Sequence, residues 1–177
     1  MKKIYFLSIF VLILLSACTM QEEKNQNTSP IQEDKENVIY LIYSPLCPHC
    51  HYMIEYLKKY ENEIKIVKTT EVGKYISYLS ENFNFSWDGG VPLLFGIVEN
   101  KTLIAIQGYP TEQQENNGYF LGKEKEQKLC ENLNGEKIVI NEDYKFCKLP
   151  NGVIIGNKYA VDYLINMCKT KGCAGIY

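Results

Sequence analysis

The chain has no arginine: all 19 of its basic residues are lysines, and they face 21 aspartates and glutamates. Nucleic-acid-binding proteins gather basic residues on one face and use the planar guanidinium of arginine to grip phosphate. The lack of arginine and the net charge of −2 therefore argue against a nucleic-acid partner.

An apolar run long enough to cross a bilayer is also missing at the start of the chain. The run from Ile4 to Leu15 is broken by Ser8 and is shorter than the roughly 20 residues that a spanning helix needs. Because Lys2 and Lys3 precede it, the run predicts a signal peptide over residues 1–17.

The end of this run, Leu15-Ser16-Ala17-Cys18, resembles the bacterial lipobox, in which a signal peptidase cuts before a cysteine that carries lipid. The resemblance implies that Cys18 becomes the lipidated first residue of an extracytoplasmic protein anchored to the cell membrane. The alternatives are an ordinary signal peptide, or an uncut anchor, with an incidental cysteine.

Residues 18–36 are polar, net acidic and without apolar periodicity. Such a segment cannot bury enough surface to offset the entropy of ordering it. We therefore expect a flexible, lipid-anchored tether over 18–36 and a folded domain over 37–177.

The first half of this domain alternates between strand and helix patterns. Four segments have the composition of strands: 38–43, 63–69, 92–97 and 102–107. Between them, apolar residues recur at helical spacing over 50–57 and 72–83. The predicted order is strand, helix, strand, helix, strand, strand.

The second half is less regular. Residues 109–122 are rich in Gln, Asn and Gly and predict a loop, and a short helix is expected over 123–133. Three short strands follow, at 137–140, 144–148 and 153–155. Asn157 can cap a last helix, on which Val161, Leu164, Ile165 and Cys168 share a face.

A Cys-Pro-His-Cys motif lies where the first strand ends and the first helix begins. Cys47 would sit beside the unsatisfied N–H groups and the positive dipole end of that helix, which favours its thiolate, the attacking species in disulfide exchange. Pro48 suits an early helical position, and His49 would stabilise the thiolate further. Cys50, one turn inside, is placed to resolve a mixed disulfide.

A strand followed by CPHC and a helix resembles the thioredoxin superfamily, and CPHC is the motif of its DsbA-like disulfide-forming oxidases. Members also carry a proline after a cis peptide bond, whose preceding backbone pairs with substrate; Val91-Pro92 matches that element. The resemblance covers about 38–107 and the last helix. It implies a thioredoxin-like α/β fold, a central mixed sheet flanked by helices, with a disulfide-stapled elaboration over about 108–156.

The resemblance also implies an activity: oxidation of cysteine pairs in exported proteins, with reoxidation by a quinone-linked DsbB-like or VKOR-like membrane protein and no cofactor held by the chain. A membrane-tethered reductase or isomerase, supplied by a transmembrane electron donor, is the first alternative. Two departures disfavour it: no tryptophan precedes Cys47, and the first strand carries no acidic residue.

The second alternative is a non-enzymatic lipoprotein that binds a metal or a partner. A CxxC pair can be half of a zinc site, and His51 could add a third ligand. No second CxxC and no HxxxH is present, so we expect no metal; an inert structural disulfide between the two cysteines is a further possibility.

Four more cysteines, Cys130, Cys147, Cys168 and Cys173, allow three pairings. In an exported protein they are expected to form structural disulfides. The sequence favours Cys130–Cys147 and Cys168–Cys173 because both pairs are local, while a relay from one pair to Cys47–Cys50 stays open.

Overall fold

The computed structural model describes residues 37–117, 124–140 and 143–177. These residues belong to one compact unit. The predicted signal peptide, the lipidated Cys18 and the tether over 18–36 lie outside the described residues.

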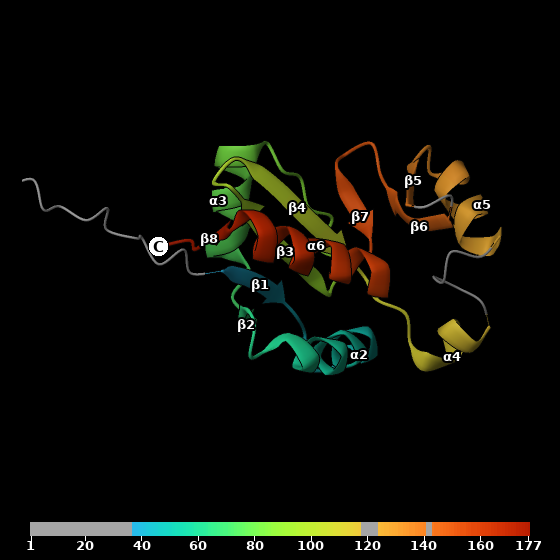
Figure 1. Ribbon diagram of the computed structural model, residues 1–177, viewed down its shortest axis with the longest axis horizontal. Coiled ribbons are helices and arrows are strands. Elements are labelled where there is room, and N and C mark those ends of the chain that lie inside the picture. The colour runs from blue at the N-terminus through green and yellow to red at the C-terminus, as the bar shows by residue number, and fades with distance from the viewer. Residues whose placement is uncertain (1–36, 118–123, 141–142) are drawn as a thin grey trace, which may run out of the picture. The chain divides into compact units, whose positions relative to one another are not determined.

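Strands and helices alternate through the first half of the unit in the predicted order (Figure 1). The elements there are β1 (Val38–Ile42), α2 (Pro48–Leu57), the 3-10 helix η1 (Lys58–Tyr60), β2 (Lys65–Thr69), α3 (Gly73–Phe83), β3 (Leu93–Val98) and β4 (Thr102–Gln107). The second half adds α4 (Glu112–Asn116), α5 (Glu124–Asn132), β5 (Glu136–Ile140), β6 (Asp143–Lys148), β7 (Val153–Ile155), α6 (Lys158–Lys171) and β8 (Cys173–Ala174).

All of these strands join one mixed sheet in the order β2-β1-β3-β4-β7-β6-β5. Strand β1 runs parallel to β2 and antiparallel to β3, and β3 is antiparallel to β4. The short β8 pairs with the end of β3 beyond β1, with Ile97 opposite Ala174. The chain is therefore an α/β protein whose mixed sheet is flanked by helices.

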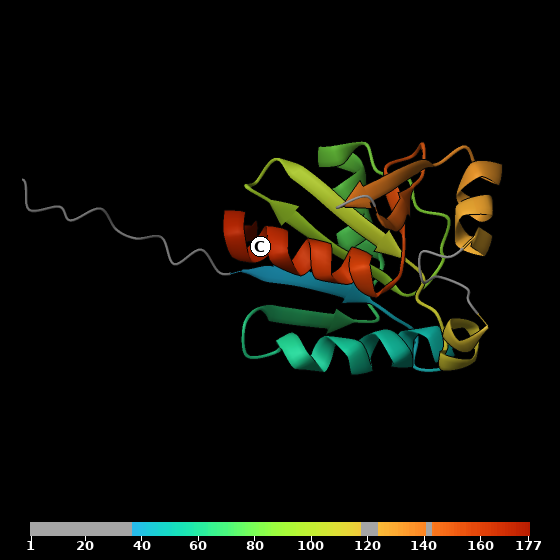
Figure 2. The same ribbon diagram turned by 45° about the vertical axis from the view of Figure 1, so that its right-hand side comes forward.

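Side-chain alternation along β1 explains why helices cover both faces of the sheet. Ile39 and Leu41 point into a core shared with α2 and α6, whereas Tyr40 and Ile42 point into a second core shared with α3. All five residues of β1 are buried, as the unbroken apolar run predicted. Figures 1 and 2 show α6 lying across the sheet on the side opposite α3.

The C-terminal elaboration is built into this sheet and is not a separate appendage. Strand β7 pairs in parallel with β4, with Ile106 opposite Ile154, and β6 and β5 then extend the sheet. The close approach needs a glycine, since a Cβ at Gly156 would overlap the carbonyl oxygen of Gly108.

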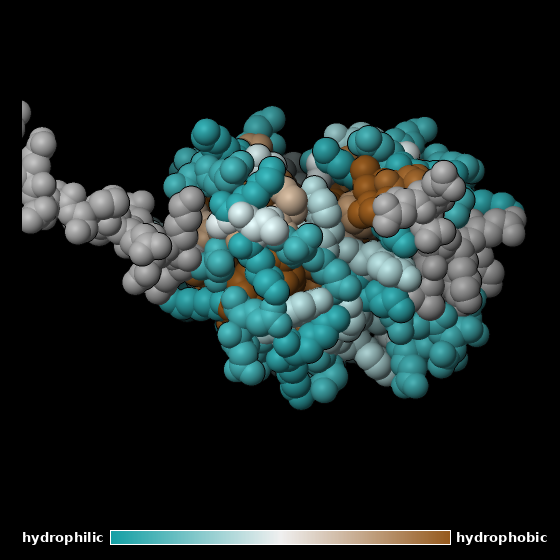
Figure 3. Space-filling view, in the orientation of Figure 1, coloured by the Kyte–Doolittle hydropathy of each residue, from teal (hydrophilic) through white to brown (hydrophobic). Residues whose placement is uncertain are grey.

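Most of the face in Figure 3 is hydrophilic, with apolar surface beside α6 and among β5–β7.

Two disulfides secure this half, in the pairing that the sequence favoured. Cys130–Cys147 joins α5 to β6, and Cys168–Cys173 joins the end of α6 to β8. The second bridge packs against β3 at Gly96, where a Cβ would come within 3.3 Å of both sulfurs.

Two short elements differ from the sequence prediction. Residues 112–116 form the helix α4 inside the segment predicted as a loop, because Thr111 and Gln114 make a reciprocal capping box. Strand β8 was not predicted either.

In the described part of the chain, no helix has both the length and the apolar character needed to cross a membrane.

Candidate active site

Cys47 occupies the N-cap position of α2, where the chain turns out of β1. Its sulfur accepts a hydrogen bond from the backbone N–H of Cys50 at 3.3 Å, and its own N–H donates to the carbonyl of Ser44 at 3.1 Å. Pro48 takes the first helical position, where its missing N–H removes no helical bond. The Cys50 N–H at the start of the helix is therefore shared between the sulfur of Cys47 and the carbonyl oxygen of Cys47, which lies at 3.1 Å.

The two thiols of the motif are unequal. Cys47 is partly exposed, whereas Cys50 is fully buried, and neither forms a disulfide in this structure. Burial raises the pKa of the Cys50 thiol to about 12, with a further contribution from its hydrogen bond to Cys47. Solvent thus reaches one sulfur, while the other stays protonated one turn deeper.

The peptide bond between Val91 and Pro92 is cis, as expected, and it lies against the dithiol. The Cys47 thiol donates to the carbonyl oxygen of Val91 at 3.6 Å. The carbonyl of Pro92 accepts from the N–H of Gly108 at 2.8 Å, which ties this turn to the end of β4. The structure therefore brings together residues 44 positions apart that the sequence had assigned to one site.

The ring of His49 makes a contact that the sequence did not predict. Its Nδ1 lies 2.6 Å from the carbonyl oxygen of Tyr109. A carbonyl can only accept, so Nδ1 carries a proton and donates it there, which leaves Nε2 as the free ring nitrogen. Stabilisation of a Cys47 thiolate by His49 stays a prediction; the hydrogen bond that this ring makes in the structure goes to Tyr109.

Tyr109 is a residue of this site that sequence reasoning missed. It lay in the segment predicted as a loop, and nothing local links it to a motif 60 positions away. Its side chain is buried and its ring centroid lies 5.7 Å from that of Tyr56 on α2. Tyr109 thereby joins the chain after β4 to α2.

The loop before Cys47 is also fixed, and it presents an apolar residue. His51 Nε2 donates to the carbonyl oxygen of Pro45 at 2.7 Å. This hydrogen bond of the exposed histidine connects the loop to α2. Leu46 is 92% exposed directly before Cys47. An apolar side chain is thus exposed directly beside Cys47.

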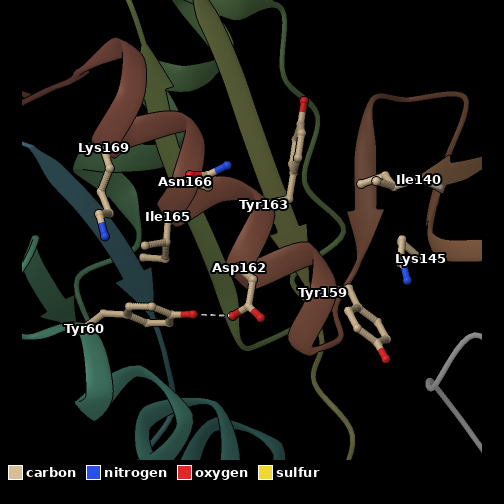
Figure 4. A pocket seen from close by; sticks show the side chains of 9 residues that line it. All are labelled: Tyr60, Ile140, Lys145, Tyr159, Asp162, Tyr163, Ile165, Asn166 and Lys169. Carbon is tan, nitrogen blue, oxygen red and sulfur yellow. Dashed lines mark hydrogen bonds between the residues drawn. The ribbon is translucent and has the colours of Figure 1, made fainter.

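A tyrosine–carboxylate cluster holds the C-terminal end of α2 and the 3-10 helix η1 against α6. Asp162 Oδ1 on α6 accepts hydrogen bonds from the hydroxyls of Tyr56 at 2.7 Å and Tyr60 at 2.5 Å. Figure 4 shows the Tyr60 hydroxyl directed at Asp162 across a groove of about 430 Å³. Burial, and then the hydrogen bond to Asp162, raise the pKa values of both tyrosines.

Among the described residues, the other four cysteines offer Cys47 and Cys50 no metal-binding partner. All four of those are closed in disulfides. Over residues 37–117, 124–140 and 143–177, no three His, Cys, Asp or Glu side chains are grouped so that they could hold a metal ion.

Comparison of the chain with protein-family models, with curated proteins and with solved structures finds no match. The function must therefore be inferred from the residues of this chain. Among the described residues, the unequal pair of thiols at the start of α2 is the strongest candidate for a reactive site.

Proposed function

We propose that this protein is a thiol–disulfide oxidoreductase of the thioredoxin-like class, with Cys47 as the sulfur that exchanges with substrate. The observation that carries the proposal is the asymmetry of the dithiol. One sulfur is reachable and hydrogen-bonded by a helix N–H, and its partner is buried and protonated. Enzymes that exchange disulfides need this division between an attacking and a resolving thiol.

The arrangement of the sheet supports the same class. The order β2-β1-β3-β4, with α2 and α6 on one face and α3 on the other, resembles a thioredoxin core. A cis-proline turn opposite the reactive cysteine is a second point of resemblance. The backbone of Val91, directly before the cis proline, would pair with the substrate backbone there.

In the oxidising direction, a substrate thiolate attacks Cys47 Sγ of the Cys47–Cys50 disulfide. The bond between these two sulfurs breaks, a substrate–Cys47 bond forms, and Cys50 leaves as a thiolate that takes up a proton. A second substrate thiolate then attacks the substrate sulfur of the mixed disulfide and releases Cys47. The substrate loses two electrons and two protons, and the dithiol of the enzyme gains them.

The buried position of Cys50 governs how long the mixed disulfide lasts. Burial and the Cys47 sulfur both raise its pKa. Once Cys47 is held in a mixed disulfide, the contribution of its sulfur is lost and only burial opposes deprotonation. Cys50 is therefore easier to deprotonate in the intermediate than in the free dithiol, which favours its attack on Cys47 Sγ. That attack re-forms the Cys47–Cys50 disulfide and releases the substrate sulfur as a thiolate.

We further propose that the direction is oxidation of exported proteins at the outer side of the cell membrane. His49 between the cysteines, and the absence of a tryptophan before Cys47, favour an oxidase over a reductase. The lipobox-like Leu15–Cys18 supports anchoring at that membrane. Regeneration needs an oxidant, for which we propose a quinone-linked membrane protein that accepts the two electrons.

Trapping of mixed disulfides tests this proposal. Cys50→Ala leaves Cys47 without its resolving partner, so disulfide-linked complexes with exported proteins are expected to accumulate and to disappear under reductant. Cys47→Ala is the matched control, in which no complexes are expected. An absence of complexes in the first variant, or equal amounts in both, would rule out exchange at Cys47.

Alkylation of the wild-type protein in living cells then gives the direction. A pair found mostly as the disulfide supports the oxidase. A pair found mostly as free thiols contradicts it and favours a reductase.

A further inference from the structure

A groove of about 440 Å³ runs along α2 beside the redox motif. Three tyrosines line it: Tyr52 and Tyr56 from the helix and Tyr109 from the segment after β4. The groove adjoins the dithiol because Tyr109, one of its walls, also accepts the hydrogen bond from His49. We call it the tyrosine groove.

The tyrosine groove carries an excess of negative charge. Glu55, Glu112 and Glu115 line it, against a single lysine, Lys158. Glu55 forms an exposed ion pair with Lys58 at 2.5 Å. Within the described part of the chain, no cation pairs with Glu112 or Glu115.

The carboxylates and the aromatic rings face the same space. The negative charge of Glu115 adds to burial in raising the pKa of Tyr109, so this carboxylate lies near the tyrosine ring. Lys59 Nζ sits 3.7 Å from the centroid of the Tyr56 ring, so a lysine of this chain already uses one tyrosine as a cation–π partner. Tyrosine faces beside unpaired carboxylates suit a cation with an aliphatic stem.

We propose that the tyrosine groove binds a lysine- or arginine-bearing segment of the substrate polypeptide, next to the cysteine that reacts at Cys47. This inference rests on the thiol–disulfide exchange proposed above and narrows its substrate class. A basic side chain would lie over the tyrosine rings and place its charge between Glu112 and Glu115.

The length of α2 sets where the basic residue should lie in the substrate. An α-helix rises 1.5 Å per residue, so Tyr56, one of the rings that the basic side chain would cover, lies about 14 Å along the axis from Cys47. An extended chain covers that span in roughly four residues. The preferred substrate therefore has its lysine or arginine about four positions from the reactive cysteine.

The test compares three synthetic dithiol peptides that differ only at that position, which holds lysine, glutamine or glutamate. The probe reaction is reduction of the Cys47–Cys50 disulfide of the full chain at low salt. We expect the order lysine, glutamine, glutamate, with about a fivefold ratio of second-order rates between the first and the last, as two or three exposed charge contacts would give. The ratio should approach one at 0.5 M NaCl.

Two double variants show where the preference arises. Glu112→Gln with Glu115→Gln should bring the lysine-to-glutamate ratio close to one. Glu71→Gln with Glu81→Gln removes the same charge from two exposed positions outside the groove, one in the turn before α3 and one on α3, and should keep the ratio. Equal rates for the three peptides with the wild-type protein, or an equal loss of preference in both double variants, would overturn the proposal.

Dithiothreitol, which carries no charge, distinguishes a failure of the groove proposal from a failure of the proposed thiol–disulfide exchange. If it reduces the Cys47–Cys50 disulfide while the three peptides react alike, the groove proposal fails and the exchange chemistry stands. If neither dithiothreitol nor any peptide reduces that disulfide, the proposed function fails and the groove proposal falls with it.

Discussion

Removal of the Asp162 carboxylate tests whether the tyrosine–carboxylate cluster holds α2 against α6. Asp162→Ala deletes the acceptor of two hydroxyl hydrogen bonds, from Tyr56 and Tyr60. A hydrogen bond to a buried charged group is worth roughly 1.5–3 kcal/mol. Asp162 is 43% exposed, so we take about 1 kcal/mol for each bond, in line with the weakness of solvated ion pairs.

The free energy of unfolding should therefore fall by about 2 kcal/mol in Asp162→Ala, with a drop in Tm of roughly 6 °C for a domain of this size. Asp162→Asn is the matched control, because its Oδ1 can still accept both hydroxyls and only the charge is lost. We expect a loss of about 1 kcal/mol there. Urea unfolding followed by circular dichroism gives both values.

Two results would refute this reasoning. An alanine variant within about 0.5 kcal/mol of the wild-type protein would mean that the two hydroxyls find water as good a partner as the carboxylate. An asparagine variant as unstable as the alanine variant would mean that charge, and not the hydrogen-bond geometry, carries the effect.

Three further predictions concern the frame around the site. Gly156→Ala should lower the free energy of unfolding in urea by about 3 kcal/mol or more, because its Cβ would overlap a backbone carbonyl. Gly73→Ala is the control: open space surrounds Gly73, so the free energy of unfolding should be unchanged or rise by about 0.5 kcal/mol. Replacing Cys130 and Cys147 together by serine should lower the free energy of unfolding by about 3 kcal/mol, since the bridge closes a loop with a sequence separation of 17; a loss below 1 kcal/mol would contradict the loop-closure account. Stability should also fall as pH rises above about 10, because burial raises the pKa of four tyrosines in the folded state, so the unfolded chain gives up their protons first. The four tyrosines are Tyr40, Tyr56, Tyr60 and Tyr109. The absorbance of tyrosinate against pH measures their titration in the folded protein. Titration of every tyrosine near pH 10 would contradict the prediction.

Local patterns in the sequence were enough to predict the main elements. The run 38–43 has apolar residues on both faces and became β1, buried on both sides. The face of Val161, Leu164, Ile165 and Cys168 became the buried side of α6. Such elements are predictable because their periodicity reports which side faces the core.

Features that depend on distant partners were not predictable in the same way. Strand β8 has two residues, and it exists because the Cys168–Cys173 bridge and the contact of Cys173 N–H with the Asn37 side chain hold it beside β3. The parallel pairing of β7 with β4 likewise depends on a close approach between glycines that lie far apart in sequence.

The residues of the candidate site fall into the same two classes: some carry a local sequence signal, and others depend on distant partners. The strand end, the CPHC motif and the cis-proline turn each carry a local signal, so they were expected together. The Tyr109 carbonyl that binds His49, and the Asp162 that binds Tyr56, come from other elements of the fold. Only α4 was missed despite a readable signal, the Thr111–Gln114 capping box.

The most direct test of the account is the order in which iodoacetamide modifies the two thiols of the reduced, folded protein at neutral pH. Since Cys47 is reachable and Cys50 is buried with its pKa raised to about 12, mass spectrometry should find a single adduct on Cys47, and a second on Cys50 only after unfolding. Modification of Cys50 first, or of both thiols of the folded protein at the same rate, would contradict the division of labour on which the proposed chemistry depends.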